Sequence, residues 1–416
     1  MLAEALYVSC SGGTEYLAHR TNEGLRHSVS RKNIYCHMGI PVNPSSLRND
    51  SFGNDEQSAA PLTPLKVLVV DDSATVRQVL AAVLPEKHGF RVTAAADPLI
   101  AMEKMKKSVP DVILLDLEMP RMDGMTFLRK LMAESPLPVV ICSGLTGPNT
   151  ESAIRALESG AVDIITKPKI GVRGFLEESA VLLEDTVRAA AEARVRKSRR
   201  HQTSTKIKPR EGLPQQPLLP GSKEGGKIIA VGASTGGTEA LLYLFERMPQ
   251  DCPGIVAVQH MPEGFTAAFA RRLDSSCAIE VREAADGDQV VPGRAYIAPG
   301  NRHTYVRRMG PTYFLEVRDG ALVSRHRPSV NVLFRSAAQA AGANAVGVLL
   351  TGMGDDGADG LLEMKRANAF TIAQDEPTCV VFGMPREAIL LGAVEEILPL
   401  HRIPQALLRP LKVQKG

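Results

Sequence analysis

The 416-residue chain lacks the features that mark membrane-spanning, secreted and metal-thiolate proteins. It has no apolar run of the roughly 18 residues that a membrane-spanning helix needs. Its N-terminus has neither the basic start nor the long apolar stretch of a signal peptide. Its six cysteines are scattered, without a CxxC pair or metal-ligand spacing, which suits a reducing compartment. We therefore expect a cytoplasmic protein that is not inserted in a membrane.

The sequence also has little net charge and no signature of several common binding modules. Its formal net charge is +3, so no global excess of positive charge points to nucleic acid. It contains no helix-turn-helix pattern, no internal repeat and no G-x-G-x-x-G spacing for a dinucleotide. The length exceeds that of one typical domain, and the apolar content is sufficient for two or three cores.

Two segments lack sustained periodicity. We expect residues 1–64 to be a disordered N-terminal extension. A start codon placed too early would also explain their composition, with Met38 as a later start. Between Glu192 and Glu211 there are eight lysines or arginines and no acidic residue, followed by several prolines and glycines. This composition predicts an extended linker over 191–226. The alternative is a basic arm that docks on an acidic protein surface or on nucleic acid.

The rest of the chain alternates apolar strand patterns with helical patterns. The fold class is therefore α/β, with two doubly wound parallel-sheet domains joined by the linker. The first, residues 65–190, is flavodoxin-like, and the second, residues 227–411, is Rossmann-like. Helices are expected near 73–84 and 175–196, and an antiparallel edge hairpin over 302–324. Strands are expected at 66–70, 91–96, 111–117, 138–143, 162–166, 227–233, 254–260, 294–298, 345–351 and 370–373.

Polar residues follow the strands of the first domain at the points where the strands end. Asp71 and Asp72 end the first strand, and Asp116 ends the third. Ser143 ends the fourth strand and Lys167 the fifth. Clustered carboxylates need a hard cation, and Mg²⁺ takes few protein oxygens. A carboxylate beside that cation can accept a phosphoryl group whose oxygens the hydroxyl and the ammonium contact.

This set resembles the receiver domain of two-component response regulators, over about residues 65–190. The resemblance implies that Asp116 is the phosphoacceptor and that Ser143 and Lys167 contact the phosphoryl group. It also implies that Asp71, Asp72 and Asp116 hold Mg²⁺ together with the backbone carbonyl of Glu118. The aromatic residue that often precedes the lysine by three positions in this family is replaced here by Ile164. This departure favours signalling through loop or helix-face rearrangement.

Three strands of the second domain also end at reactive residues. Ser234 lies in a G-x-S-x-G pattern over 232–236, a tight turn that presents a hydroxyl. His260 and Asp356 follow two further strands. Because the carboxyl ends of parallel strands share one crevice, we expect the three side chains to meet there. Serine, histidine and aspartate in one crevice form an activated nucleophile.

Several alternatives remain open from the residues alone. The glycine-rich turn could instead hold a phosphate at a helix N-terminus, as a nucleotide-binding module would. His303 and His326 compete with His260 as the base. Asp355 and Asp356 are adjacent, and the pattern does not choose between them.

The segments GASTGG, QHMP, TGMGDDG and CVVFGMPREA resemble the catalytic domain of the chemotaxis protein-glutamate methylesterase family. With the receiver in front, the resemblance covers nearly all of residues 65–410. It implies Ser234 as nucleophile, His260 as base and Asp356 as the group that orients the histidine. It also implies that the backbone amide of Met353 donates to the oxyanion.

The resemblance further implies a phosphorylation-activated hydrolase, a methylesterase that is also a glutamine deamidase. Its substrates would be γ-glutamyl methyl esters and specific glutamines on the cytoplasmic helices of methyl-accepting chemoreceptors, in chemotaxis or a related pathway. A chemotaxis-type histidine kinase would donate the phosphoryl group. Mg²⁺ would serve the receiver, and the ester chemistry would need no cofactor. We expect a monomer without a nucleic-acid partner, in which the unphosphorylated receiver covers the cleft of Ser234.

Overall fold

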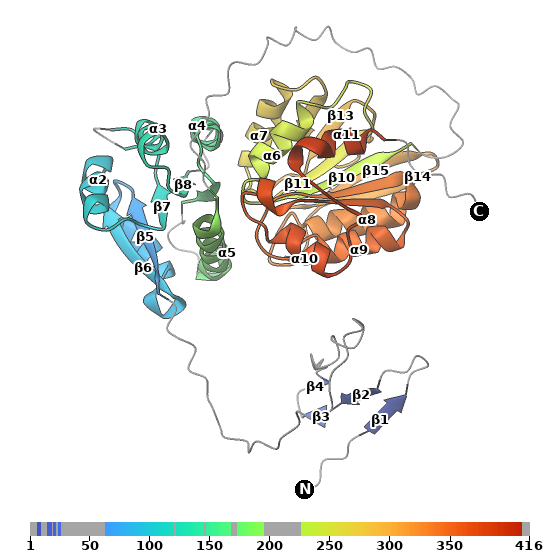
Figure 1. The fold of residues 1–416 in the computed structure, drawn as a ribbon, viewed down its shortest axis with the longest axis horizontal. Coiled ribbons are helices and arrows are strands. Elements are labelled where there is room, and N and C mark those ends of the chain that lie inside the picture. The colour runs from blue at the N-terminus through green and yellow to red at the C-terminus, as the bar shows by residue number, and fades with distance from the viewer. Residues whose placement is uncertain are drawn as a thin grey trace, which may run out of the picture. The chain divides into compact units, whose positions relative to one another are not determined.

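The computed structural model describes two units of the chain (Figure 1). The described residues are 6–9, 15–18, 20–21, 24–25, 63–119, 122–144, 147–167, 173–194 and 226–409. The first unit is Met1–Ala60 and the second is Pro61–Gly416. In the first, β1 (Leu6–Ser9) pairs antiparallel with β2 (Glu15–Ala18), and β3 (Arg20–Thr21) with β4 (Gly24–Leu25). The other residues up to 62 lie outside the described residues, so the disorder expected for 1–64 stays a prediction there. The same holds for residues 195–225 of the expected linker.

The first part of the second unit, described over 63–194 with short gaps, contains a five-stranded parallel sheet. Its strand order is β6-β5-β7-β8-β9, the order of a flavodoxin-like fold. The strands are β5 (Leu65–Val70), β6 (Phe90–Ala95), β7 (Val112–Leu115), β8 (Val139–Ser143) and β9 (Asp163–Thr166). The helices are α1 (Ala74–Val83), η3 (Glu86–His88), α2 (Pro98–Lys107), α3 (Gly124–Glu134), α4 (Gly147–Glu158) and α5 (Arg173–Glu192).

The helices cover both faces of this sheet. Alternate residues of each strand point to opposite faces. Val67 and Val69 of β5 pack with α1 and α5, whereas Leu68 and Val70 pack with α2, α3 and α4. Because both faces are buried, the strands read as continuous apolar runs rather than as alternating patterns. The expected strand-and-helix order is confirmed for this part.

Residues 226–409 form a seven-stranded parallel sheet of order β12-β13-β11-β10-β16-β17-β18. Strands β11 and β16 lie on opposite sides of β10, so the strand order reverses beside β10. The strands are β10 (Ile228–Ala233), β11 (Gly254–Gln259), β12 (Glu280–Glu283), β13 (Arg294–Ile297), β16 (Ala345–Leu349), β17 (Phe370–Gln374) and β18 (Glu396–Leu398). This order confirms the α/β fold class, and it predicts a crevice at the carboxyl ends of the central strands.

Two layers of helices enclose this sheet, with α6, α7 and α11 on one face and α8, α9 and α10 on the other (Figure 1). The helices are α6 (Gly237–Phe245), α7 (Phe265–Asp274), α8 (Val330–Ala341), α9 (Ala358–Arg366), α10 (Met384–Leu390) and α11 (Ile403–Leu407), with short 3₁₀ turns η4 (Gly342–Asn344), η5 (Glu376–Thr378) and η6 (Leu400–Arg402). The central strand β10 is buried at every position. No described helix is both long enough and apolar enough to cross a membrane.

The expected hairpin is present, but it is not an edge of the large sheet. Strands β14 (His303–Met309) and β15 (Thr312–Arg318) form a two-stranded antiparallel sheet of their own. The amide of Val306 in β14 donates to Ser336 Oγ of α8 at 3.0 Å, so the hairpin covers the α8 side of the domain. The edges of the large sheet are instead β12 and β18, which the sequence patterns did not indicate.

Candidate functional site

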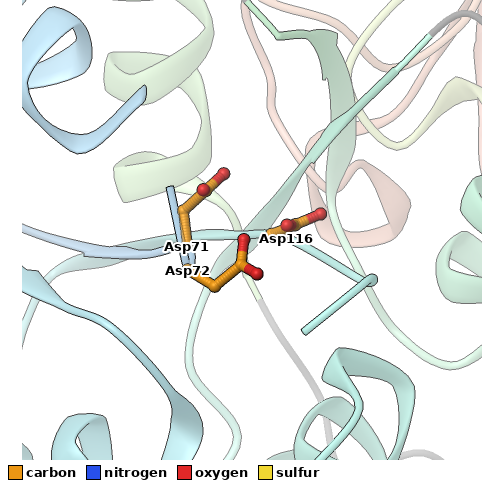
Figure 2. Close-up of side chains that lie close together, drawn as sticks. All are labelled: Asp71, Asp72 and Asp116. Carbon is orange, nitrogen blue, oxygen red and sulfur yellow. The ribbon is translucent and has the colours of Figure 1, made fainter. Parts of the chain in front are cut away.

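Three carboxylates meet at the carboxyl edge of the five-stranded sheet. Asp71 and Asp72 directly follow β5, and Asp116 directly follows its neighbour β7. One oxygen of each carboxylate lies within 4.8 Å of the others (Figure 2). Asp71 Oδ2 is buried, and Lys167 Nζ lies 3.1 Å from it. An all-carboxylate donor set of this kind fits a hard divalent cation such as Mg²⁺.

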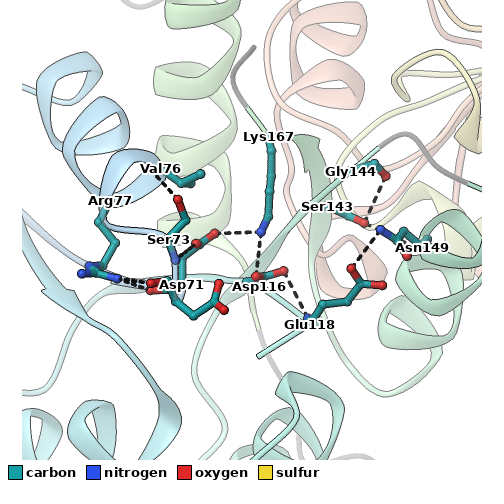
Figure 3. A network of polar contacts seen from close by, with 11 residues as sticks. Asp71, Ser73, Val76, Arg77, Asp116, Glu118, Ser143, Gly144, Asn149 and Lys167 are labelled. Carbon is teal, nitrogen blue, oxygen red and sulfur yellow. Dashed lines mark hydrogen bonds and ion pairs between the residues drawn. The ribbon is translucent and has the colours of Figure 1, made fainter. Parts of the chain in front are cut away.

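Lys167 reaches from the end of β9 into this cluster (Figure 3). Its Nζ lies 2.6 Å from Asp116 Oδ2 and 3.1 Å from Asp71 Oδ2. Burial raises the pKa of Asp116, although the hydrogen bond and the charge of Lys167 oppose this effect. Burial lowers the pKa of Lys167, but hydrogen bonds to the two aspartates outweigh it and raise that pKa overall. Lys167 is therefore a cation held between two carboxylates.

The other residues expected at this edge lie around Asp116. The amide of Glu118 donates to Asp116 Oδ1 at 3.2 Å, which places Glu118 beside the cluster. Asn149 Nδ2 donates to Glu118 Oε2 at 3.1 Å, a contact that the sequence did not indicate. Ser143 is buried, and its Oγ donates to the Gly144 carbonyl at 3.3 Å (Figure 3). The role of Ser143 at a phosphoryl group and that of the Glu118 carbonyl at a metal stay predictions.

Sequence reasoning also missed Arg77, which fixes the acidic loop. Its Nη1 donates to the carbonyls of Asp71 at 2.7 Å and Asp72 at 2.9 Å. The amide of Ser73 donates to Asp71 Oδ1 at 2.8 Å, and the Ser73 hydroxyl caps α1. The detectable signal was the N-cap serine with an arginine one helical turn later.

Ser234 directly follows β10 in a turn that requires glycine. Gly236, the N-cap residue of α6, has a φ of +76°, a conformation that L side chains rarely adopt. A Cβ at this position would also collide with the Val380 side chain. The amide of Ser234 donates to the Thr351 carbonyl at 3.0 Å, which ties the turn to the loop after β16.

The hydrogen bonds of this turn argue against a phosphate-binding loop. The amides of Ser234 and Gly237 already donate to backbone carbonyls. That of Gly237 donates to the Ser234 carbonyl at 2.7 Å. The side chain of Gln259 at the end of β11 donates to the Ser234 carbonyl at 2.9 Å. Phosphate cradles leave such amides free for the ligand. The turn instead presents one hydroxyl.

His260 and Asp356 are joined directly. His260 Nε2 lies 2.8 Å from Asp356 Oδ2, although the two residues are 96 positions apart. Asp356 is fully buried, while the adjacent Asp355 is exposed. The sequence did not choose between Asp355 and Asp356. The structure distinguishes them, since of the two only Asp356 contacts an imidazole.

The N-terminus of α8 holds the Asp356 carboxylate from the other side. Ser329 Oγ donates to its Oδ1 at 2.7 Å, and the amides of Val330 and Asn331 donate at 2.7 and 3.0 Å. Burial would raise the pKa of Asp356, but the hydrogen bonds from His260, Asn331 and Ser329 hold it below its ordinary value. The partial positive charge of a helix N-terminus also favours an anion there. Asp356 is therefore a carboxylate, and His260 must donate its Nε2 proton to it.

The remaining nitrogen of His260 is the one that is free to act as a base. Its Nδ1 is buried and takes part in no hydrogen bond. Between these described side chains no hydrogen bond joins Ser234 Oγ to His260, a bond that often tightens only when substrate binds. The TGMGDDG loop lies against Ser234, since a Cβ on Gly352 would come within 2.7 Å of Ser234 Cβ. Met353, the next residue, is half-buried at this place.

The two competing histidines have different surroundings. His303 is buried, its Nε2 donates to the Ala321 carbonyl at 2.8 Å, and its Nδ1 accepts from the Ser329 amide at 3.2 Å. Both its nitrogens are thus occupied by backbone, so it cannot accept a serine proton. His326 instead stacks on His260, with ring centroids 3.7 Å apart and planes inclined by 12°. Neither histidine contacts Asp356 through a hydrogen bond in the described residues.

Both domains of this chain are similar in sequence to known proteins. A family model described as CheB methylesterase matches residues 229–407, and one described as response regulator receiver domain matches residues 67–172. The curated "protein-glutamate methylesterase/protein-glutamine glutaminase 5" of Anaeromyxobacter dehalogenans is 61% identical over 83% of this chain and 96% of its own length. A curated protein of the same name, numbered 3, from Geobacter metallireducens is 57% identical over 83% of this chain and 98% of its own length.

Among solved structures, the Thermotoga maritima CheB methylesterase catalytic domain is 40% identical. It covers 44% of this chain and 97% of its own length, with a TM-score of 0.43.

Proposed function

The chain belongs to the CheB methylesterase family, and from this premise we propose that Ser234, His260 and Asp356 form the catalytic triad of the enzyme. The enzyme is a protein-glutamate methylesterase and protein-glutamine glutaminase that carries a receiver domain. One observation supports the triad above all others. The His260–Asp356 hydrogen bond lies at the carboxyl ends of the two strands that flank β10, which presents Ser234.

Acylation uses the free nitrogen of the imidazole. His260 Nδ1 takes the proton of Ser234 Oγ while that oxygen attacks the γ-carbonyl carbon of a glutamate methyl ester. The charge that develops on His260 is balanced by the Asp356 carboxylate behind Nε2. The tetrahedral intermediate collapses when the imidazolium returns its proton to the methoxy oxygen, which leaves as methanol.

Deacylation repeats the sequence with water. His260 Nδ1 takes a proton from water, the hydroxide attacks the acyl-enzyme, and Ser234 leaves with the proton, which yields glutamate. A glutamine amide reacts in the same way, because the imidazolium can protonate the leaving nitrogen and release ammonia. The Met353 amide, beside Ser234 in the glycine-rich loop, is the proposed oxyanion donor.

The proposed substrates are methylated glutamates and specific glutamines on the cytoplasmic helices of chemoreceptors. The family assignment supports this substrate class, and a chemotaxis-type histidine kinase is the proposed phosphodonor. We assign the protein to the cytoplasm, in agreement with the free thiols of Cys142, Cys252, Cys277 and Cys379. Methanol release from methyl-labelled chemoreceptor, with and without acetyl phosphate and Mg²⁺, tests the whole proposal. If acetyl phosphate and Mg²⁺ did not stimulate methanol release, the proposal would be contradicted.

Residues 65–190 are the proposed receiver, and Asp116 is its proposed phosphoacceptor. Asp71, Asp72 and Asp116 would hold Mg²⁺, which neutralises phosphoryl oxygens when bound. An oxygen of Asp116 attacks phosphorus, and the bond from phosphorus to the donor's leaving group breaks. Lys167, now 2.6 Å from Asp116, would exchange that contact for one to a phosphoryl oxygen.

Replacing Asp116 with asparagine is expected to abolish phosphorylation by acetyl phosphate. An amide is a poor nucleophile, and Asp71 and Asp72 cannot substitute for Asp116 while they bind the metal. Phosphate incorporation, measured by intact mass or by a labelled donor, is the readout. Glu134→Gln, in the exposed last turn of α3, is the matched control and is expected to incorporate phosphate normally. Wild-type incorporation in the Asp116 variant would exclude this assignment.

Two contacts within Pro61–Gly416 support regulation of the esterase by the receiver. Helix α4 packs against α6 and α7. Thr235 Oγ1, next to the nucleophile, donates to Asp163 Oδ2 of β9 at 2.8 Å. Asp163 directly precedes Ile164, the residue at the position of the family's switch aromatic. We propose that the unphosphorylated receiver restricts access to Ser234 and that phosphorylation of Asp116 relieves the restriction.

A fragment of residues 223–416 is therefore expected to hydrolyse receptor methyl esters faster than the unphosphorylated full chain and to ignore phosphodonors. The contacts through α4 are missing from the fragment, whereas the triad and α8 are all retained. Initial rates of both proteins, each with and without acetyl phosphate and Mg²⁺, give the comparison. A fragment slower than the resting full chain would mean that the receiver assists catalysis instead.

A further inference from the structure

A strained turn lies directly beside the triad. In Val323–His326 the amide of Val323 donates to the His326 carbonyl at 3.1 Å, and the amide of His326 donates back at 2.9 Å. The central residues, Ser324 and Arg325, have φ values of +48° and +65°. Left-handed backbone is unfavourable for an L-residue, and such strain concentrates at functional sites. Asn331 Nδ2 donates to Ser324 Oγ at 3.1 Å, which ties the turn to the helix that holds Asp356.

This turn delivers one imidazole onto another. The rings of His326 and His260 are nearly parallel and 3.7 Å apart, which is van der Waals contact. Burial, together with the nearby His260, lowers the pKa of His326 to about 3. His326 therefore stays neutral throughout the range in which the esterase could operate. The mechanism above leaves this ring without a role.

The contacts of His260 show how the stacked His326 ring affects its orientation and its charge. Its Nε2 is held by Asp356 at 2.8 Å, and one ring face is covered by His326. These two contacts fix the plane of the ring, so the partnerless Nδ1 keeps one direction. When His260 takes a proton it becomes a cation against a neutral aromatic face, an arrangement that is favourable. A charged residue in the same place would oppose that protonation.

We propose that His326 is a positioning residue of the esterase: its neutral ring holds the plane of His260 and stabilises the imidazolium that forms when His260 carries the Ser234 proton. The inference rests on the proposed role of His260 as the base. Other charged groups near the pair are Asp356, behind His260, and Arg325, in the same turn. Asp163 also interacts electrostatically with His260.

Two variants of similar size separate this role from simple filling of space. His326→Phe keeps a neutral aromatic face, whereas His326→Leu fills the same volume without one. Both are made in the full chain, activated with acetyl phosphate and Mg²⁺, and assayed on methyl-labelled chemoreceptor. His401→Ala, exposed in η6, controls for the loss of a histidine as such. Thermal melts of each variant confirm that it is folded.

The phenylalanine variant is expected to keep kcat within about three-fold of the wild-type value. The leucine variant should lose about three- to thirty-fold in kcat, with KM nearly unchanged, because the missing interaction belongs to the protonated state of the base. The acid limb of its kcat/KM profile should move to lower pH by roughly half to one unit, since the imidazolium is less stabilised. The His401 variant should match the wild type.

Leucine and phenylalanine variants that both keep the wild-type kcat and the wild-type pH profile would overturn the inference and leave His326 as packing. A phenylalanine variant as slow as the leucine variant would also overturn it, because the ring nitrogens would then be the functional part. A Ser234→Ala protein measured in the same series keeps the two proposals apart. If it retained turnover, the triad itself would be wrong. If it were inactive while leucine equalled phenylalanine, only the inference about His326 would fail.

Discussion

Replacing Ser234 with alanine is expected to lower methyl-ester hydrolysis by roughly 10⁴- to 10⁶-fold. The proposed mechanism has no other group that could form the acyl-enzyme. The fold should be unaffected, since Ser234 is held in its turn by backbone atoms. Its amide donates to Thr351 and its carbonyl accepts from Gln259, and alanine keeps both contacts. The measurement is methanol release, alongside labelling by a fluorophosphonate probe, which should disappear in the variant.

Thr238→Ala, which removes a hydroxyl from α6 outside the turn, is the control for this experiment. It should retain both turnover and probe labelling. A Ser234→Ala protein that kept more than about a hundredth of the wild-type rate would show that Ser234 is not the nucleophile, because loss of a triad serine removes far more than that.

Replacing Asp356 with asparagine is expected to reduce turnover by roughly 10³- to 10⁴-fold. The amide is neutral, so the imidazolium formed at His260 loses its counter-charge. An asparagine NH₂ group facing Nε2 would also turn that nitrogen into an acceptor and move the proton to Nδ1, where it blocks the base. Stability should fall as well, because the donors at the start of α8 then face a weaker acceptor.

Asp355→Asn is the matched comparison, because it makes the same change one residue earlier at an exposed position. Its turnover should stay within a few-fold of the wild-type rate. Steady-state hydrolysis and the rate of fluorophosphonate labelling should both rank the wild type and the Asp355 variant far above the Asp356 variant. The reverse ranking would assign the orienting carboxylate to Asp355.

The sheets and the strand-end residues could be predicted because one physical rule governs both. A parallel strand covered on its two faces is a continuous apolar run, as in Ile228–Ala233, and the residue after it lies at the shared edge. The edge strands escaped prediction for the converse reason. The runs of β12 and β18 are short and only partly buried, so solvent exposure removes the apolar signal.

The finer structure of the site depends on contacts between residues far apart in the chain, which no local pattern encodes. Asp355 and Asp356 share one loop, and contacts of Asp356 with the distant His260 and with the start of α8 distinguish them. His303 begins the hairpin and His326 follows it, and no local pattern shows which of the two lies beside His260. His303 is hydrogen-bonded to backbone atoms, whereas His326 is placed beside the proposed triad by a turn with two left-handed residues. Ser and Arg at such positions carry no sequence signal for that turn, since glycine and asparagine are the residues that usually mark it.

The order of the large sheet places the three proposed triad residues at the ends of adjacent strands. The strands that present His260, Ser234 and Asp356 are three immediate neighbours, β11, β10 and β16. The spacing of the proposed triad therefore follows from the inter-strand distance of about 4.8 Å, which backbone hydrogen bonds maintain whatever the side chains are. The hairpin and the edge strands lie outside this trio. Changes confined to the hairpin or to the edge strands therefore leave the spacing of these three strands unchanged.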